Sequence, residues 1–200
     1  MQRRLLFIAI GLLGGVLIWM LVVWRPAGEE AGEASDGRLS TPPEGGGFSL
    51  VSYRGPVNLS DFHGKVVLLY FGYTWCPDIC PTNLAMMSAA LNEMRSDELA
   101  GVQGIFISVD PHRDTPQRLK AYVEYFHPQL LGLTGSDVEI AVTAGRYGAA
   151  YRPVKEDAEG QYAVDHTADT YIIDRRGKLV MALPHGSGVE ALLAVIRSLL

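Results

Sequence analysis

The chain has 200 residues, of which 48% are hydrophobic and 20% are charged, and its formal net charge is −5 at pH 7. This length accommodates one membrane segment and one soluble domain. The acidic balance and the lack of a basic run exclude a typical nucleic-acid-binding protein, so no nucleic-acid partner is expected.

The first predicted element is an apolar stretch at residues 5–24, which contains no charged side chain. As a helix it is long enough to cross a hydrocarbon core of about 30 Å. It is too long for the apolar part of a cleavable signal peptide, and no small-residue cleavage site follows it directly. The sequence therefore predicts a signal anchor, residues 1–24, that stays in the membrane as a single transmembrane helix.

The charges around this span predict its orientation. Arg3, Arg4 and the amino terminus precede the span, although Arg25 and Arg38 follow it. A large C-terminal domain also translocates largely regardless of charge. We therefore expect the domain on the extracytoplasmic, periplasmic-type side. Residues 25–47 are rich in Gly, Pro, Ser and Glu, which is typical of a flexible linker.

The remaining residues, 48–200, alternate short apolar strands with amphipathic helices. A small N-terminal hairpin, two buried strands, three helices, a second hairpin and a terminal helix are expected. Their predicted positions are residues 48–51 with 55–58, 66–71, 84–94, 104–109, 119–126, 138–147, 171–174 with 179–182, and 189–200. Thr115 and Pro116 form an N-cap and a first helical residue before 119–126. This order predicts an α/β fold, a thioredoxin-like three-layer sandwich with an N-terminal hairpin.

The chain has only two cysteines, Cys76 and Cys80, and they lie between the strand 66–71 and the helix that follows it. Because proline is excluded from helix interiors, we place Pro81 at the first helical position and Cys80 at the helix N-terminus. The free N–H groups at that end favour a thiolate. A structural disulfide gains most by closing a long loop, so this closely spaced pair favours a redox dithiol or a soft-metal site.

Two thiolates leave a metal ion under-coordinated, so the five histidines are candidate further ligands. His63, His127 and His185 are expected in turns or loops away from the thiols. His112 follows the strand 104–109. It is expected either at the surface or in contact with a metal ligand, without binding the metal itself.

His166 differs from the other histidines because it shortly precedes the strand 171–174. In a thioredoxin-like fold this loop faces the cysteine pair and ordinarily carries a cis-proline, which is missing here. We therefore predict that Cys76, Cys80 and His166 form one group.

Three separated motifs carry a family resemblance. They are Gly-Tyr-Thr-Trp-Cys-Pro-Asp-Ile-Cys-Pro at 72–81, Ser-Val-Asp-Pro-His-Arg-Asp-Thr-Pro at 108–116, and Val-Asp-His-Thr at 164–167 with Tyr-Ile-Ile-Asp at 171–174. With these motifs, residues 48–200 resemble the Sco/SenC family of copper proteins, which serve assembly of cytochrome c oxidase. The sequence departs from the family's motif pattern in two small ways. Trp75 occupies a variable position, and His112 stands where a glutamate is frequent.

The resemblance implies that Cys76, Cys80 and His166 are metal ligands that hold one copper ion per domain, as Cu(I) or Cu(II). It implies a membrane-tethered copper metallochaperone that delivers copper to the binuclear copper site of cytochrome c oxidase. The expected partners are the copper-site subunit of the oxidase and an upstream copper donor. Asp78 and Asp165 are candidates to contact the metal ligands, and the alternative is that both are solvated loop carboxylates. Asp110 either caps the loop of the site or simply lies at the end of the strand 104–109.

The main alternative is an enzyme, an extracytoplasmic thiol–disulfide oxidoreductase that keeps the acceptor's cysteines reduced. The fold and the thiol pair favour this alternative, whereas the missing cis-proline and the three-residue spacing of the cysteines oppose it. A peroxidase is weaker because no arginine lies within the cysteine loop. A structural zinc site is also weaker, because it needs four ligands and the chain has no second closely spaced histidine.

Overall fold

The computed structural model describes Trp19 and residues 43–154 and 162–200. The chain divides into two units, Met1–Thr41 and Pro42–Leu200. Apart from Trp19, the predicted span 5–24 lies outside the described residues, as does most of the predicted linker. Among the described residues, no helix has the length and apolar character needed to cross a membrane.

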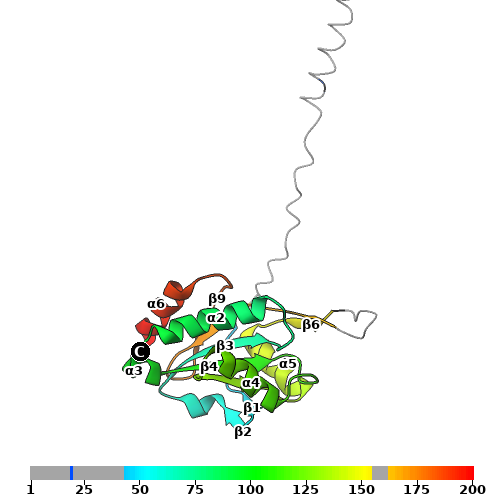
Figure 1. The fold of residues 1–200 in the computed structure, drawn as a ribbon, viewed down its shortest axis with the longest axis horizontal. Coiled ribbons are helices and arrows are strands. Elements are labelled where there is room, and N and C mark those ends of the chain that lie inside the picture. The colour runs from blue at the N-terminus through cyan, green and yellow to red at the C-terminus, as the bar shows by residue number, and fades with distance from the viewer. Residues whose placement is uncertain (1–18, 20–42, 155–161) are drawn as a thin grey trace, which may run out of the picture. The chain divides into compact units, whose positions relative to one another are not determined.

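The second unit is built on a five-stranded mixed sheet with the strand order β5-β4-β3-β8-β9 (Figure 1). Its strands are β3 (Val66–Gly72), β4 (Val102–Ser108), β5 (Leu130–Leu133), β8 (Thr170–Ile173) and β9 (Leu179–Leu183). β3, β4 and β5 run parallel to one another, whereas β8 is antiparallel to both of its neighbours. The two predicted buried strands and the predicted second hairpin are confirmed.

Two small two-stranded sheets accompany the main sheet. β1 (Ser49–Ser52) pairs with β2 (Gly55–Asn58), which confirms the N-terminal hairpin, and a short 3-10 helix η1 (Leu59–Phe62) follows. β6 (Tyr151–Pro153) pairs with β7 (Val164–His166). This second pair was not predicted, because strands of three residues are too short to show an alternating pattern.

Helices cover both faces of the main sheet. They are α2 (Ile79–Asn92), α3 (Ser96–Ala100), α4 (Pro116–Phe126), α5 (Asp137–Tyr147) and α6 (Val189–Leu199). Neighbouring residues of a strand point to opposite faces. The Tyr70 ring lies against Phe106, which lies against Tyr122 of α4, whereas the Phe71 ring lies against Tyr147 of α5.

α2 packs against α4 and α6, so these three helices share one face and α5 covers the other. The predicted three-layer α/β sandwich is confirmed. The start of α4 also follows the prediction, because Pro116 is its first residue and the Thr115 side chain accepts a hydrogen bond from the backbone N–H of Arg118.

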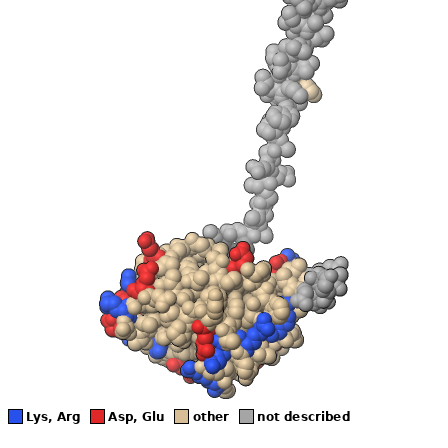
Figure 2. Space-filling view, in the orientation of Figure 1, with Lys and Arg blue, Asp and Glu red and all other residues tan. Residues whose placement is uncertain are grey.

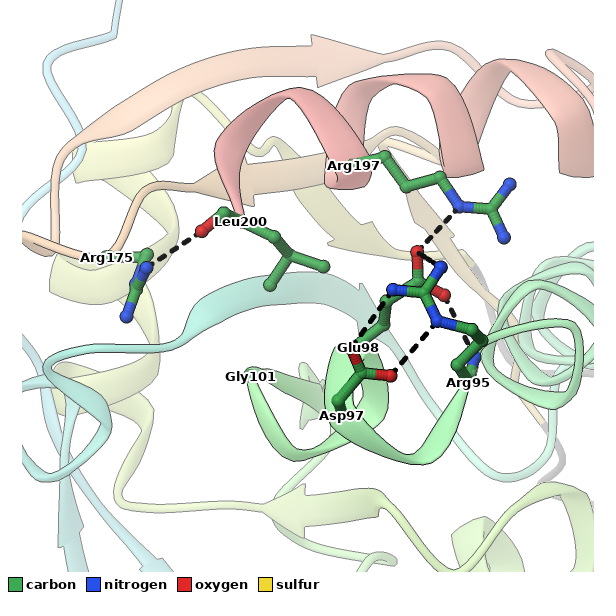
Figure 3. A pocket seen from close by; sticks show the side chains of 7 residues that line it. All are labelled: Arg95, Asp97, Glu98, Gly101, Arg175, Arg197 and Leu200. Atoms are coloured by element: carbon green, nitrogen blue, oxygen red, sulfur yellow. Dashed lines mark hydrogen bonds and ion pairs between the residues drawn. The ribbon is translucent and has the colours of Figure 1, made fainter.

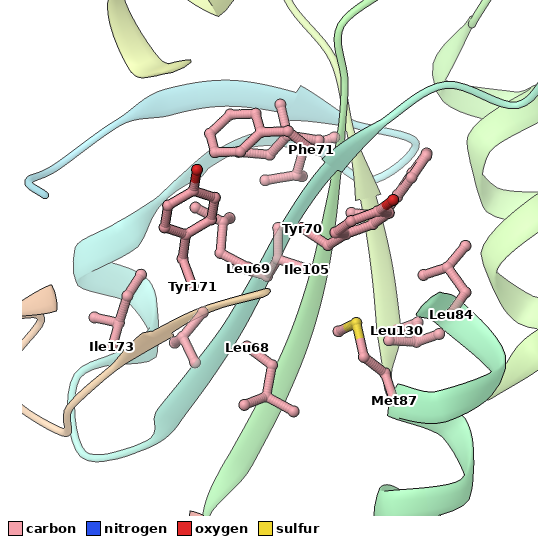
Figure 4. Close-up of a cluster of buried hydrophobic side chains, with 14 of the residues drawn as sticks. Leu68, Leu69, Tyr70, Phe71, Leu84, Met87, Ile105, Leu130, Tyr171 and Ile173 are labelled. Atoms are coloured by element: carbon pink, nitrogen blue, oxygen red, sulfur yellow. The ribbon is translucent and has the colours of Figure 1, made fainter. Parts of the chain in front are cut away.

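β3 forms the centre of the core, and all seven of its residues are buried. Figure 4 shows Leu84 and Met87 of α2 on one side of β3 and Tyr171 of β8 on the other. Fully burying a side chain of this size stabilises the fold by about 1.5–3 kcal/mol. The end of β3 is therefore a firm support for the residues that follow it.

The carboxyl end of the chain is fastened to the sheet and to α3 by arginines (Figure 3). Arg197 Nε lies 3.1 Å from Glu98 Oε1, and Arg175 Nη1 donates to the Leu200 carbonyl over 2.8 Å. These groups line a surface hollow together with Arg95, Asp97 and Gly101. The hollow is lined by neither thiol nor imidazole, and its carboxylates already pair with Arg95 and Arg197.

Candidate metal centre

The candidate site lies at the edge of the main sheet where β3 ends. β3 and β4 are parallel, so their carboxyl ends share this edge. β8 is antiparallel to β3 and pairs Thr170 with Tyr70, so β8 begins at the same edge. The loop after Gly72 and the segment before Thr170 therefore meet, although 86 positions separate Cys80 from His166.

The structure brings the three predicted residues together. Cys80 Sγ lies 3.3 Å from His166 Nε2, and the backbone N–H of Cys80 donates to Cys76 Sγ over 3.4 Å. The candidate ligand atoms of Cys76, Cys80 and His166 all lie within 4.8 Å of one another. This arrangement offers two sulfur atoms and one imidazole nitrogen to a single ion.

The helix that carries Cys80 begins earlier than predicted. α2 starts at Ile79 with Asp78 as its N-cap, so Cys80 is the second helical residue and Pro81 the third. The prediction that Pro81 comes first is therefore wrong. A helix leaves its first four N–H groups without intrahelical partners, so proline is tolerated in the whole first turn. The free N–H of Cys80 is the group that donates to Cys76.

Cys80 is fully buried, with 0% of its surface exposed, and the Tyr70 hydroxyl lies 3.8 Å from its sulfur. Gly72 lies on the same face of β3 as Tyr70. A Cβ atom at Gly72 would lie 2.6 Å from Cys80 Sγ and 2.8 Å from Phe106 Cε2. Glycine is therefore required at this position to make room for the sulfur, a role that the motif alone did not reveal.

The imidazole of His166 is held in one orientation. Its Nδ1 lies 3.1 Å from the Thr167 carbonyl oxygen, and a proton on Nδ1 leaves the Nε2 lone pair facing Cys80. A hydrogen bond of this kind fixes the tautomer of many metal-ligating histidines. The rings of Tyr70 and Tyr73 flank the imidazole edge-on, with centroids 6.1 and 5.8 Å away.

The two thiols have opposite acidities. The hydrogen bond with the Cys80 thiol is the largest cause that lowers the pKa of Cys76, to about 4, and the backbone N–H groups of Cys80 and Asp78 add to it. The same hydrogen bond, together with burial, raises the pKa of Cys80. In the metal-free, reduced protein the two sulfurs therefore carry one proton between them. This proton is bound to Cys80, and Cys76 is a thiolate.

The other histidines lie outside this group. His63 is exposed, and the exposed His112 pairs with Asp137 across 3.2 Å. His127 is buried at the end of α4, where its Nδ1 accepts a hydrogen bond from Gln129 N.

His185 makes a contact that was not foreseen. Its Nδ1 lies 3.0 Å from Asn83 Oδ1, and Asn83 Nδ2 donates to the Ala168 carbonyl over 2.9 Å. The buried amide of Asn83 thus links the His185 loop to the segment that follows His166.

The candidate carboxylates have different surroundings. Asp165 is exposed and pairs with Arg152, and the Asp78 side chain makes no capping hydrogen bond. Asp110 is buried and accepts hydrogen bonds from Arg113 and Tyr162, so it caps a loop beside the site.

Asp114 is a residue that sequence reasoning missed. It is fully buried and accepts hydrogen bonds from the backbone N–H and hydroxyl of Thr74, over 2.9 and 2.6 Å, and from the Ser108 hydroxyl over 2.6 Å. A buried carboxylate needs such partners. Asp114 therefore fastens the loop that leads to Cys76 onto the end of β4.

The surface beside the thiols combines apolar and aromatic side chains with arginine. Half of the Trp75 surface is exposed, Ile79 is exposed as well, and the Arg118 guanidinium lies 4.7 Å from the Trp75 ring centroid. The sequence of α2 contains no charged residue, and Figure 2 shows a largely uncharged upper part of this face, with Lys and Arg side chains running below it. Cys76 is only partly buried, so it is the sulfur that another molecule can reach.

The first prediction concerns the acidity of Cys76. In the reduced, metal-free protein, Cys76 should react with iodoacetamide at pH 6, where an ordinary thiol of pKa about 8.5 is almost fully protonated. Its reaction should decline only as the pH falls toward 4, because the lowered pKa keeps the thiolate ionised down to that range. Peptide mass spectrometry across pH 4–9 measures this. In Cys80→Ala the midpoint should move upward, and a wild-type midpoint near pH 8 would contradict the assignment.

The second prediction concerns the space at Gly72. Gly72→Ala should lower the free energy of unfolding by about 1–3 kcal/mol, because the added methyl group overlaps the sulfur of Cys80 and the Phe106 ring. The matched control is Gly145→Ala, where a Cβ has no neighbour within 4 Å and stability should be unchanged or higher. Urea unfolding of the reduced proteins measures both. Equal stability of Gly72→Ala and wild type would show that the sulfur does not need this space.

Comparison with known proteins identifies the family. The SCO1/SenC family profile matches residues 37–200. The mitochondrial protein SCO2 homolog of Bos taurus is 43% identical over 134 residues, which are 66% of this chain and 50% of the relative. The chain thus spans about half the length of that relative.

Solved structures agree with this match. The copper-bound structure of Arabidopsis thaliana ScoI is 39% identical, with a TM-score of 0.71 over 76% of this chain and 96% of that chain. The structure of BsSco, a member of the Sco family of cytochrome c oxidase assembly proteins in which a disulfide switch was identified, is 25% identical. It has a TM-score of 0.62 over 80% of this chain and 96% of that chain. The resemblance drawn from the three motifs is confirmed, and the chain belongs to the SCO1/SenC family.

Proposed function

We propose that this protein binds one copper ion through Cys76, Cys80 and His166 and delivers it to the binuclear copper site of cytochrome c oxidase. The observation that carries the proposal is the convergence of two sulfurs and one imidazole nitrogen within 4.8 Å. The copper-bound relative from Arabidopsis thaliana and the oxidase-assembly role of the family of BsSco support it.

The donor atoms are of the kinds that bind copper. Thiolates are soft ligands that suit Cu(I), and imidazole suits copper in both oxidation states. Cys76 is ionised before the metal arrives, so copper has to displace only the proton of Cys80. Copper binding should therefore release a proton, and the affinity should fall as the pH falls.

The arrangement also fits a cargo that must leave again. Structural metal sites are usually closed by four protein ligands, whereas this group offers three. Cys80 is buried and holds its place, whereas Cys76 and His166 are partly exposed. Ligands of the acceptor would reach the ion from the side of Cys76, next to Trp75. The acceptor in this proposal is the copper-site subunit of the oxidase, and an upstream donor supplies the copper.

The predicted membrane segment would keep this exchange at the membrane surface. We assign residues 5–24 to an N-terminal anchor, residues 25–47 to a linker and residues 48–200 to the copper-binding domain. The domain would lie on the extracytoplasmic side, within reach of a membrane-embedded oxidase. The apolar, uncharged character of residues 5–24 is the support for this assignment.

A second function, thiol–disulfide exchange, is favoured by the acidity of Cys76 and the contact between Cys76 and Cys80. A thiolate beside a buried thiol is the arrangement of a redox-active pair. The disulfide switch identified in BsSco points in the same direction. Because both functions use the same sulfurs, a Cys76–Cys80 disulfide would exclude copper, and bound copper would block disulfide exchange.

The third prediction tests the ligands. The reduced protein should bind one equivalent of copper. Cys76→Ser, Cys80→Ser and His166→Ala should each weaken Cu(II) binding by more than about 100-fold. The effect should be this large because losing a residue that only contacts a metal ligand already lowers metal affinity about 10–100-fold. Competition titration measures the affinity, and thiolate-to-copper absorption bands report the sulfurs. The matched control is His112→Ala, which removes an exposed imidazole outside the group. Wild-type affinity in His166→Ala would remove His166 from the site.

A further inference from the structure

His166 lies at the end of a short two-stranded element, whose position depends on contacts with the rest of the domain. β6 and β7 form a separate two-stranded sheet, and a two-stranded hairpin is marginally stable by itself in water. The carboxyl end of β7 is fastened by the Thr167 N–H, which donates to the Ala150 carbonyl over 2.9 Å, and by the bond from Asn83 to Ala168. At the amino end of β7, Val164 is buried in the core, and the segment that leads to it from Tyr162 makes further contacts.

These further contacts form a cluster of Asp110, Arg113 and Tyr162, which we call the arginine clamp. Tyr162 precedes His166 by four residues, and its hydroxyl donates to Asp110 Oδ1 over 2.7 Å. Arg113 donates to Asp110 through Nε and to the Tyr162 carbonyl through Nη1, over 2.9 Å. The guanidinium also stacks on the Tyr162 ring, 3.6 Å from its centroid.

Arg113 also contacts the loop that carries the cysteines. Its guanidinium carbon lies 5.7 Å from the Tyr73 ring centroid and 5.9 Å from that of Trp75. The Tyr73 ring in turn packs edge-on against His166. One planar cation thus joins the loop after β4, the cysteine loop and the segment before His166. A planar guanidinium suits this place because it stacks on aromatic rings and donates in several directions at once.

We propose that Arg113 and Tyr162 are positioning residues, which hold the segment from Tyr162 to His166 so that the imidazole already faces Cys80 before copper arrives. A site ordered in advance loses less conformational entropy on binding and gains affinity. The consequence for copper rests on the proposed function, whereas the ordering of the segment can be measured without any metal.

The sharpest variant is Tyr162→Ala. Tyr162 is only partly buried, and its removal leaves the pair of Asp110 and Arg113 intact, so the domain should keep its fold. In the reduced, metal-free, full-length protein, the backbone amides of residues 164–167 should exchange hydrogen about tenfold faster than in wild type. Tyr162→Phe keeps the stacked ring and should restore most of the protection. The matched control is Tyr125→Ala, because Tyr125 on α4 is 85% exposed and should change nothing.

Copper gives the second readout. Tyr162→Ala should bind Cu(II) about tenfold more weakly, with the nitrogen hyperfine splitting of its electron paramagnetic resonance spectrum reduced and the thiolate band retained. The reduction potential of the Cys76–Cys80 disulfide should equal that of wild type. Unchanged amide exchange, or faster exchange with unchanged copper affinity, would overturn the proposal. If the wild-type protein bound no copper, the proposed function would be wrong. The amide exchange alone would then test whether the arginine clamp orders the segment before His166.

Discussion

The antiparallel pairing of β8 with β3 is the constraint on which the site depends. The register that places Thr170 beside Tyr70 brings the start of β8 to the edge where β3 ends. A strand running in the other direction would begin at the opposite edge and would carry His166 away from the thiols. Tight burial of β3 between two helical layers keeps this edge fixed. Sheet topology thus brings Cys80 and His166 to the same edge, where Cys80 Sγ lies 3.3 Å from His166 Nε2.

The two sulfurs have unequal environments, which suits the proposed binding and release of a metal ion. Cys80 is packed between Tyr70 and the backbone of Gly72, and it keeps its proton. Cys76 is ionised and partly exposed. In the proposed function, an incoming metal ion or disulfide would meet Cys76 first, and the buried sulfur would complete the reaction. His166 would distinguish the two reactions, because disulfide exchange requires no third ligand.

Local patterns in the sequence predicted many of these elements. The long apolar runs of β3 and β4 and the pair of Thr115 and Pro116 define their elements by themselves. The convergence of His166 on the thiols followed from the predicted fold alone. The position of Pro81 was wrong by two residues, because the whole first turn of a helix tolerates proline.

Other features depend on contacts between distant segments, which one sequence does not reveal. β6 has only three residues, too few to show a period, and β5 is a short strand interrupted by Gly132. The burial of Asp114 and its bonds to Thr74 exist only after folding, as does the contact of Arg113 with Tyr162. These polar contacts fasten the loops around the ligands. The sequence therefore predicted the candidate ligands but missed the residues that hold them in place.

Copper delivery by this site can be tested through the maturation of cytochrome c oxidase in cells that carry His166→Ala under copper limitation. We expect these cells to lose oxidase activity, while the purified variant still reduces a small disulfide substrate through Cys76 and Cys80. Normal oxidase activity in cells with that variant would rule out copper delivery through His166 and would make thiol–disulfide exchange the main task of the site.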